Sequence, residues 1–316
     1  MDSSSSEDKA RARRGRHSNG ARKKRQSRLA KLAALVIGPL LTATTQLSDA
    51  VWKDTGMWAI DTANTNCLES ARDKVLPRSK ADIQLLQETK VRTKQEAEAA
   101  VRGLRREGWN AHVPVAKTND SGRGSGGCAV AARLGTGVTP VDADLILPEF
   151  RHRISAAHVS AVMKGGIHVI SVYLKDSVGL TDYNLRVLQE VAALALTLGT
   201  PWIIAGDWNI TPDQLQAANW LGVAKGTVFA TELPTCHSNT YDYFVVSHNL
   251  THAVVGVQRI GDAGLHPHHP CRLLLRGDAK RKAVRKLTRA PKIHATLPHG
   301  PAPKPPDYDK IFSLGS

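Results

Sequence analysis

The sequence predicts an α/β or α+β domain, built as a four-layered sandwich with two mixed β-sheets packed face to face and helices outside. Three observations lead to this prediction. Many short apolar runs end at Gly, Pro, Asn or Asp, which is typical of strands that run into turns. Two long segments with helical periodicity separate groups of these runs. The hydrophobic content of 41% is ordinary for a chain that forms a core. Stacked layers bury the apolar faces of both sheets and helices.

The strands are predicted from their apolar content and from the turn residues that bound them. In order, the expected strands are 57–61, 82–87, 109–115, 128–133, 154–163, 167–174, 201–205, 241–247, 253–260 and 271–275. Residues 121–127 form a glycine-rich loop before one strand, and Lys164-Gly165-Gly166 joins two others. Both features indicate hairpin-like connections.

Helices are predicted from apolar residues at helical spacing. Residues 93–107 place Ala97, Val101 and Leu104 on one face. Residues 181–198 give the clearest helix, with Thr181 as the expected N-cap. Its apolar stripe comprises Leu185, Leu188, Val191, Ala192 and Ala195. A short helix over residues 70–76 is expected to end at Pro77.

Charge divides the chain into three parts. The formal net charge is +15, yet residues 49–271 are nearly neutral. Eleven Lys or Arg lie in residues 9–48 with no acid among them, and eleven more lie in residues 272–310. We therefore expect a basic, disordered N-terminal extension (1–49) with a short apolar segment, a folded domain (50–277) and a basic, proline-rich, disordered tail (278–316).

Cationic tails of this kind bind polyanions, of which nucleic acid is the expected one, or they only keep the chain soluble. The clusters expected to contact nucleic acid are Arg22-Lys23-Lys24-Arg25 and Lys280-Arg281-Lys282. They also fit nuclear import, with a mitochondrial presequence as the alternative location. Four widely spaced cysteines indicate a reducing, intracellular compartment. The apolar run 32–43 is too short to span a bilayer, so no membrane span is expected.

The most informative stretch is Trp202-Ile203-Ile204-Ala205-Gly206-Asp207-Trp208-Asn209. An apolar strand stops at Gly206, and a carboxylate and a carboxamide follow two residues apart. Side chains two apart on extended backbone point the same way, so Asp207 and Asn209 are expected to face one pocket. The same pattern also serves as a simple turn former. Other polar residues at strand ends strengthen the functional interpretation, namely Asn64, Asn66, Glu88, Tyr173, Asp242 and His268.

The order of these residues resembles the endonuclease/exonuclease/phosphatase superfamily, and within it the abasic-site endonucleases and the endonucleases of LINE-type retrotransposons. Gln87-Glu88-Thr89-Lys90 and Gly206-Asp207-Trp208-Asn209 carry the most specific part of the resemblance. Asn64, Tyr173, the strand that Tyr241-Asp242 opens and His268-His269-Pro270 supply the rest, over about residues 57–275.

The resemblance implies hydrolysis of a phosphodiester bond, most simply in DNA, with Mg²⁺ or Mn²⁺. Glu88 would bind the metal, and Asn64 would add a carboxamide near it. Asp207 would orient and deprotonate the attacking water, with Asn209 holding the water or a phosphate oxygen. His268, oriented by Asp242, would act on the phosphate, and Tyr173 would supply a phenol. Asn66 and Lys175 are weaker candidates for phosphate contact. DNA is the expected partner, with RNA as the alternative, and no obligate protein partner is expected.

The sequence departs from the family pattern at three places. With His268 on the catalytic position, Pro267 replaces the acid that normally precedes it, which would weaken metal binding. An alternative alignment places His269 on that position instead. Leu174-Lys175-Asp176 replaces a segment that often contacts phosphate, and Cys67 replaces a common glycine.

Two other functions remain open at this point. The same superfamily contains phosphatases of inositol lipids and other phosphoesters. A catalytically decayed copy that only binds nucleic acid is the third interpretation, because of Pro267.

Overall fold

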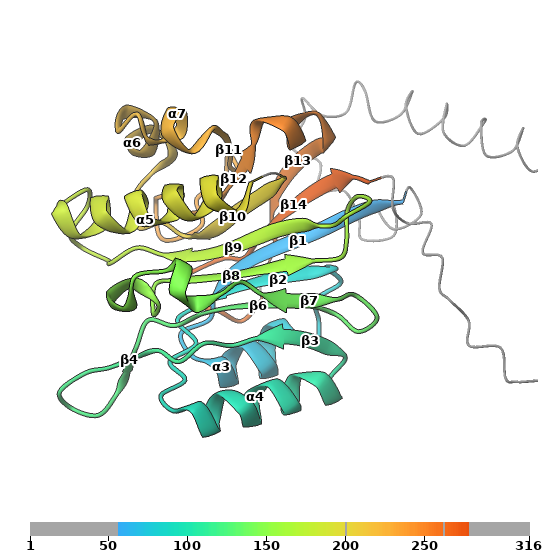
Figure 1. The fold of residues 1–316 in the computed structure, drawn as a ribbon, viewed down its shortest axis with the longest axis vertical. Coiled ribbons are helices and arrows are strands. Elements are labelled where there is room, and N and C mark those ends of the chain that lie inside the picture. The colour runs from blue at the N-terminus through green and yellow to red at the C-terminus, as the bar shows by residue number, and fades with distance from the viewer. Residues whose placement is uncertain (1–55, 200, 262, 278–316) are drawn as a thin grey trace, which may run out of the picture. The chain divides into compact units, whose positions relative to one another are not determined.

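The computed structural model describes residues 56–199, 201–261 and 263–277, and they form two mixed β-sheets with helices on both outer faces (Figure 1). One sheet has the order β13-β14-β1-β2-β6-β3, and the other β11-β12-β10-β9-β8-β7. The pairs β1–β2 and β9–β10 are parallel, and the other pairs in these two sheets are antiparallel. The predicted fold class is confirmed.

The elements have the following bounds. The first sheet contains β13 (Val254–Arg259), β14 (Cys271–Arg276), β1 (Met57–Asn64), β2 (Ile83–Gln87), β6 (Cys128–Arg133) and β3 (Trp109–His112). The second contains β11 (Gly226–Phe229), β12 (Asp242–Ser247), β10 (Trp202–Asp207), β9 (Ile167–Tyr173), β8 (Ile154–Val159) and β7 (Val138–Pro140). A separate hairpin pairs β4 (Lys117–Thr118) with β5 (Gly124–Ser125).

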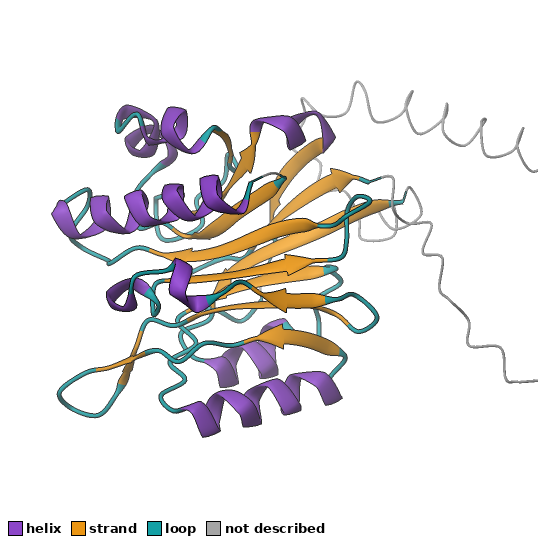
Figure 2. Ribbon diagram, in the orientation of Figure 1, coloured by secondary structure: helices purple, strands orange, loops and turns teal. Residues whose placement is uncertain are grey.

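The helices form the two outer layers, as the purple ribbons show in Figure 2. The first sheet is covered by α3 (Leu68–Ser70), the π-helical turn Ala71–Val75 and α4 (Lys94–Arg106). The second is covered by α5 (Asp182–Leu198), α6 (Pro212–Ala217) and α7 (Trp220–Ala224). Three short 3-10 helices lie in loops, at Ala143–Leu145, Pro148–Phe150 and His248–Ala253. None of the described helices is both long and apolar enough to cross a membrane.

Between the sheets lies an apolar core made from alternate strand residues, such as Ile60, Leu85 and Val169. The intervening residues of the same strands face the helices. Ile170 and Val172 of β9, for example, pack with Leu188 and Val191 of α5. This two-sided burial explains why the strands have few polar residues until their ends.

Several predicted element boundaries need correction. The third predicted strand ends at His112, and the first short helix begins at Leu68 and becomes a π-helical turn. Thr181 is the N-cap residue of α5, but its side chain makes no capping hydrogen bond. Leu185 is 36% exposed and is not part of the buried stripe. Asn184 is buried in its place, because its side chain bonds the backbone of Lys175 and Gly179.

The short elements that were not predicted are the strands β4, β5, β7 and β11, the helices α6 and α7, and the three 3-10 helices. The predicted tails 1–49 and 278–316, the apolar run 32–43, and the clusters Arg22-Lys23-Lys24-Arg25 and Lys280-Arg281-Lys282 lie outside the described residues.

Candidate active site

Strand register brings three of the predicted residues to one edge of the second sheet. Asp207 ends β10, where it pairs with Tyr173 on β9 and with Asp242 on β12. Gly206 allows the close pairing just before this edge, because a Cβ there would lie 1.8 Å from the carbonyl oxygen of Val172. The glycine that precedes Asp207 is therefore a packing requirement of the strand pair.

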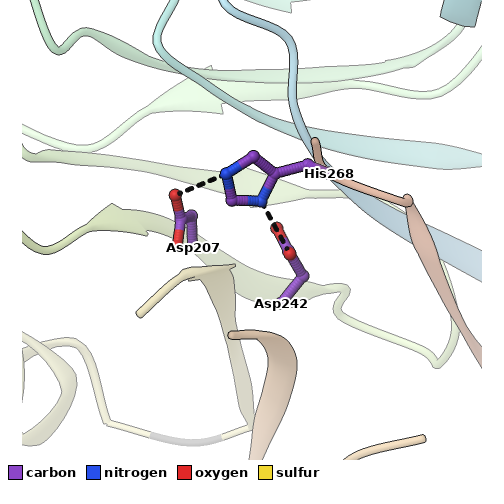
Figure 3. A group of neighbouring side chains, drawn as sticks. All are labelled: Asp207, Asp242 and His268. Carbon is purple, nitrogen blue, oxygen red and sulfur yellow. Dashed lines mark hydrogen bonds and ion pairs between the residues drawn. The ribbon is translucent and has the colours of Figure 1, made fainter. Parts of the chain in front are cut away.

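His268 lies between the two carboxylates, as Figure 3 shows. Its Nδ1 is 3.0 Å from Asp242 Oδ2, and its Nε2 is 3.6 Å from Asp207 Oδ2. All three residues are buried, although they come from β10, β12 and the segment before β14. Of the two alignments considered for the histidine, the structure places His268 against these carboxylates. His269 instead bonds Thr235 through its backbone.

Burial and mutual charge displace the pKa values of this group. Burial, together with the neighbouring charge of Asp242, raises the pKa of Asp207 to about 7. Burial by itself would lower the pKa of His268. The hydrogen bond to Asp242 and the nearby carboxylates outweigh burial and raise the pKa of His268 to about 9. Near neutral pH, Asp207 can thus exchange a proton while His268 remains positively charged.

Glu88 follows β2 and is held by three side chains. Tyr173 donates its hydroxyl to Glu88 Oε1 at 2.6 Å, and Lys90 Nζ lies 2.7 Å from Oε2. Burial would raise the pKa of Glu88, but the hydrogen bonds from Lys90 and Tyr173 outweigh it and hold the pKa below its usual value. Burial, reinforced by the charge of Glu88, raises the pKa of Tyr173, so the phenol stays protonated and can donate. Glu88 is therefore an ionised carboxylate whose oxygens can serve as metal ligands.

Asn64 joins the two sheets at the site. Its Nδ2 donates to Asp207 Oδ2 at 2.9 Å and to Glu88 Oε1 at 3.3 Å. Asn64 is the last residue of β1 and pairs with Gln87, so Glu88 follows directly beside it. The contacts from Glu88 through Asn64 and Asp207 to His268 are continuous, so these predicted residues form one cluster.

Asn209 and the two weaker candidates, Asn66 and Lys175, occupy different surroundings. Asn209 has a left-handed backbone (φ 47°), and its Nδ2 donates to Leu174 O at 2.9 Å. The argument that extended backbone points Asp207 and Asn209 the same way is wrong, because β10 ends at Asp207, whose side chain accepts from Asn209 N. Asn66 is exposed and bonds the His266 backbone at 3.0 Å. Lys175 is exposed, with Nζ 5.9 Å from the Tyr183 ring centroid.

Four cations near the site were not assigned roles from the sequence. Arg153 is buried, with its guanidinium 4.7 Å from the centroid of the Tyr173 ring. Lys90, Arg92 and Arg123 line a cavity of about 520 Å³ that Glu88 and Tyr173 also line. Only Lys90 had a sequence signal, since it belongs to the motif around Glu88. Arg153 and Arg123 reach the site through β-pairing that no local pattern reports.

Two groups of side chains are candidates for a metal ion. Glu88 and Asn64 offer hard oxygen atoms of the type that Mg²⁺ prefers. Asp207, Asp242 and His268 also have ligand atoms within 4.8 Å of one another. In that second group both ring nitrogens of His268 face carboxylate oxygens, which is the arrangement of a proton relay. The Glu88 group is therefore the better candidate for the metal.

Similar proteins were found by sequence family and by structure. The Endonuclease/Exonuclease/phosphatase family matches residues 62–264. No curated protein sequence matches the chain significantly. Three solved structures have a similar fold at 15% sequence identity. The AP endonuclease LMAP from Leishmania major aligns over 73% of this chain and 91% of its own, with a TM-score of 0.53. The endonuclease domain of TRAS1, a telomere-specific non-LTR retrotransposon, aligns over 70% of this chain and 98% of its own, with a TM-score of 0.51. The human Nocturnin catalytic domain with bound sulfate aligns over 69% of this chain and 94% of its own, with a TM-score of 0.50.

The family match covers more than half of the chain and contains Asn64, Glu88, Tyr173, Asp207 and Asp242. It ends before His268, which the structure places in contact with Asp242. The two sheets and their outer helices agree with the fold of the solved structures. The chain belongs to the endonuclease/exonuclease/phosphatase family.

Proposed function

We propose that the protein is a divalent-metal-dependent DNA endonuclease, which hydrolyses phosphodiester bonds. Membership of the family supports phosphoester hydrolysis as the reaction class. The observation that carries the proposal is the contact of Asn64 with both Glu88 and Asp207. This contact places an ionised carboxylate and a buried acid–histidine relay on either side of one amide.

The relay supplies the proton chemistry. Asp207 accepts a proton from the attacking water, since its pKa of about 7 matches neutral conditions. His268, which stays protonated, donates a hydrogen bond to a phosphoryl oxygen and offsets the charge that develops there. Asp242 accepts from Nδ1 and thereby fixes which ring nitrogen faces the phosphate. Tyr173 donates its phenol proton toward Glu88 and can redirect it to the phosphate.

Glu88 and Asn64 fit a hard divalent cation, Mg²⁺ or Mn²⁺, because Glu88 is held ionised. When bound, such an ion neutralises phosphate charge and acts as a Lewis acid. A cation that binds Glu88 Oε2 would compete with the ammonium of Lys90, which lies 2.7 Å from that oxygen. Pro267 leaves Glu88 without the usual second acid, so we expect weaker metal binding than that acid would give.

DNA is the proposed substrate for two reasons, and RNA is the alternative. Two of the three solved structures with a similar fold are an AP endonuclease and a retrotransposon endonuclease. The cavity beside Glu88 also carries more cations than acids. Assignment to the LINE-type branch and nuclear location, with mitochondria as the alternative, stay predictions from the sequence.

A second function has a specific observation in its favour. Pro267 replaces the usual acid, and Lys90 already neutralises Glu88. A decayed, non-catalytic module would keep these contacts and bind nucleic acid without cutting it. A phosphatase of small phosphoesters would turn over soluble substrates and leave DNA intact.

A plasmid-nicking assay tests the proposal. Wild-type protein with Mg²⁺ or Mn²⁺ should convert supercoiled plasmid to nicked circles, whereas Glu88→Gln and His268→Ala should do so at least about 10²-fold more slowly. Nicking at the wild-type rate in both variants would refute the assignment. Binding without nicking under either metal supports the decayed module, and hydrolysis of a soluble phosphoester alone supports the phosphatase.

A further inference from the structure

Two residues of the candidate active site, Glu88 and Tyr173, line a cavity of about 520 Å³. The reaction is proposed to occur at Glu88. Arg92, Asn119 and Arg123 also line the cavity, and none of these belongs to the family motifs that the sequence displays. The cavity therefore extends beyond the residues needed for hydrolysis.

A structured hairpin holds Arg123 at this cavity. The side chain of Asn119 accepts from the backbone of Arg123 at 2.8 Å, and Asn119 N donates to Arg123 O at 2.9 Å. The hairpin is fixed to the segment after Glu88, because Ala116 N donates to Val91 O at 2.7 Å. This contact brings Arg92 and Arg123 to the same cavity, although 30 residues separate them in the chain.

Charge in the cavity is unevenly neutralised. Lys90 pairs with Glu88 at 2.7 Å, and Arg92 pairs with Glu96 at 2.7 Å on the exposed side of α4. Within the described residues Arg123 has no ion pair. Three cations and one acid thus line the space, which favours an anion.

We propose that Arg92 and Arg123 bind a backbone phosphate next to the one that is cleaved. The inference rests on the proposed function, because the cleaved phosphate is placed at Glu88. A guanidinium donates two parallel hydrogen bonds to phosphate oxygens, which suits this role. A substrate with a single phosphate binds at Glu88 alone, whereas a polynucleotide also places a phosphate at Arg92 and Arg123. The cavity therefore favours polynucleotides over small phosphodiesters.

The test compares Arg92→Gln and Arg123→Gln with Arg102→Gln in the full-length protein. Arg102 is a matched control, since it forms an exposed four-residue-spaced pair with Glu98 as Arg92 does with Glu96. Arg102 does not line this cavity. Two readouts are needed: affinity for a labelled DNA duplex in EDTA at several salt concentrations, and turnover of the duplex and of bis(p-nitrophenyl) phosphate with Mg²⁺.

Each cavity variant should weaken duplex binding about tenfold or more, as expected for the loss of one hydrogen-bonding contact between charged groups. The slope of log affinity against log salt should fall by about 1 for each lost phosphate contact. The loss of kcat/KM on the duplex should exceed the loss on the small diester at least about fivefold. Arg102→Gln should change binding by less than about twofold.

Two results would overturn the inference. In the first, the cavity variants bind the duplex as Arg102→Gln does. In the second, they lose turnover of both substrates equally, which would mean that the arginines act on the catalytic groups. Wild-type protein that hydrolyses neither substrate would contradict the proposed function instead, and the binding measurement would still decide the inference.

Discussion

The candidate active site holds two carboxylates, Asp207 and Glu88, whose pKa values are shifted in opposite directions. Asp207 is 1% exposed, and burial with the nearby charge of Asp242 raises its pKa to about 7. Glu88 lines an open cavity, and the hydrogen bonds from Lys90 and Tyr173 overcome burial and lower its pKa. One amide, that of Asn64, contacts both.

This difference separates two chemical tasks. A carboxylate that binds a cation must stay charged, and one that accepts a proton must have a pKa near the working pH. Burial beside Asp242 gives Asp207 a pKa near neutral pH, which suits a proton acceptor. Contact with Lys90 and Tyr173 keeps Glu88 charged, which suits a cation ligand. The comparison predicts that substitutions of the two carboxylates change different kinetic properties.

The largest expected effect belongs to Asp207→Asn. The amide keeps the size and loses the proton acceptor, so kcat should fall about 10³- to 10⁴-fold, the upper range for general acid–base catalysis. Nicking rates under single-turnover conditions would measure it. Asp213→Asn, at an exposed acid of α6, is the control. A fall of less than about tenfold would contradict the role of Asp207 as base.

Glu88→Gln should have the second largest effect, about 10²-fold at a fixed Mg²⁺ concentration. The cause differs from that of Asp207→Asn, because Glu88→Gln removes the negative charge that is proposed to bind the metal. A higher Mg²⁺ concentration should therefore recover part of the rate. A Mg²⁺ titration of nicking measures this shift, with Glu98→Gln on α4 as the control. An unchanged Mg²⁺ requirement would remove the distinction between the two carboxylates.

Asp242→Asn should change the pH profile. The reaction needs ionised Asp207 and protonated His268, so the wild-type rate should rise through about pH 7 and fall above about pH 9. Asp242 raises both pKa values, so its neutral amide should move both limbs to lower pH. The rate at about pH 8 should drop about 10²-fold. A falling limb that stays near pH 9 would show that Asp242 does not hold the charge on His268.

The smallest effect is structural. Gly126 has φ +71°, and a Cβ there would lie 2.9 Å from His152 O, beside the turn that carries Glu88. Gly126→Ala should lower the free energy of unfolding by about 1–2 kcal/mol or more and slow nicking several-fold. Gly122→Ala is a matched control, because Gly122 has φ +74° and nothing within 4 Å of the added Cβ. Chemical denaturation should show a clearly larger loss for Gly126→Ala.

Long periodic segments were the most predictable part of the fold. The predicted helix over residues 93–107 is α4 (Lys94–Arg106), and residues 128–133 form β6 with the predicted bounds. Short elements such as β7 and β11 were missed, because three or four residues give no measurable periodicity. Leu185 was placed on the wrong face, since the buried contacts of Asn184 decide how α5 turns toward the sheet.

Part of the candidate site was also predictable from local patterns, and part was not. Residue types at strand ends identified Asn64, Glu88, Tyr173, Asp207, Asp242 and His268. Local patterns failed for Asn209, whose backbone turns left-handed directly after β10. They also gave no indication of Arg153 or Arg123, whose positions depend on strand pairing and on the hairpin contact with Val91.

By itself the sequence determined which side chains stand where strands end, because apolar runs and turn residues are local properties. Only the tertiary structure decided that Asn64 and Asp207, 143 residues apart, lie 2.9 Å from each other. That contact requires the registers of both sheets and the packing of one on the other. These are long-range choices, made by the burial of whole strand faces, and no short stretch of sequence contains them.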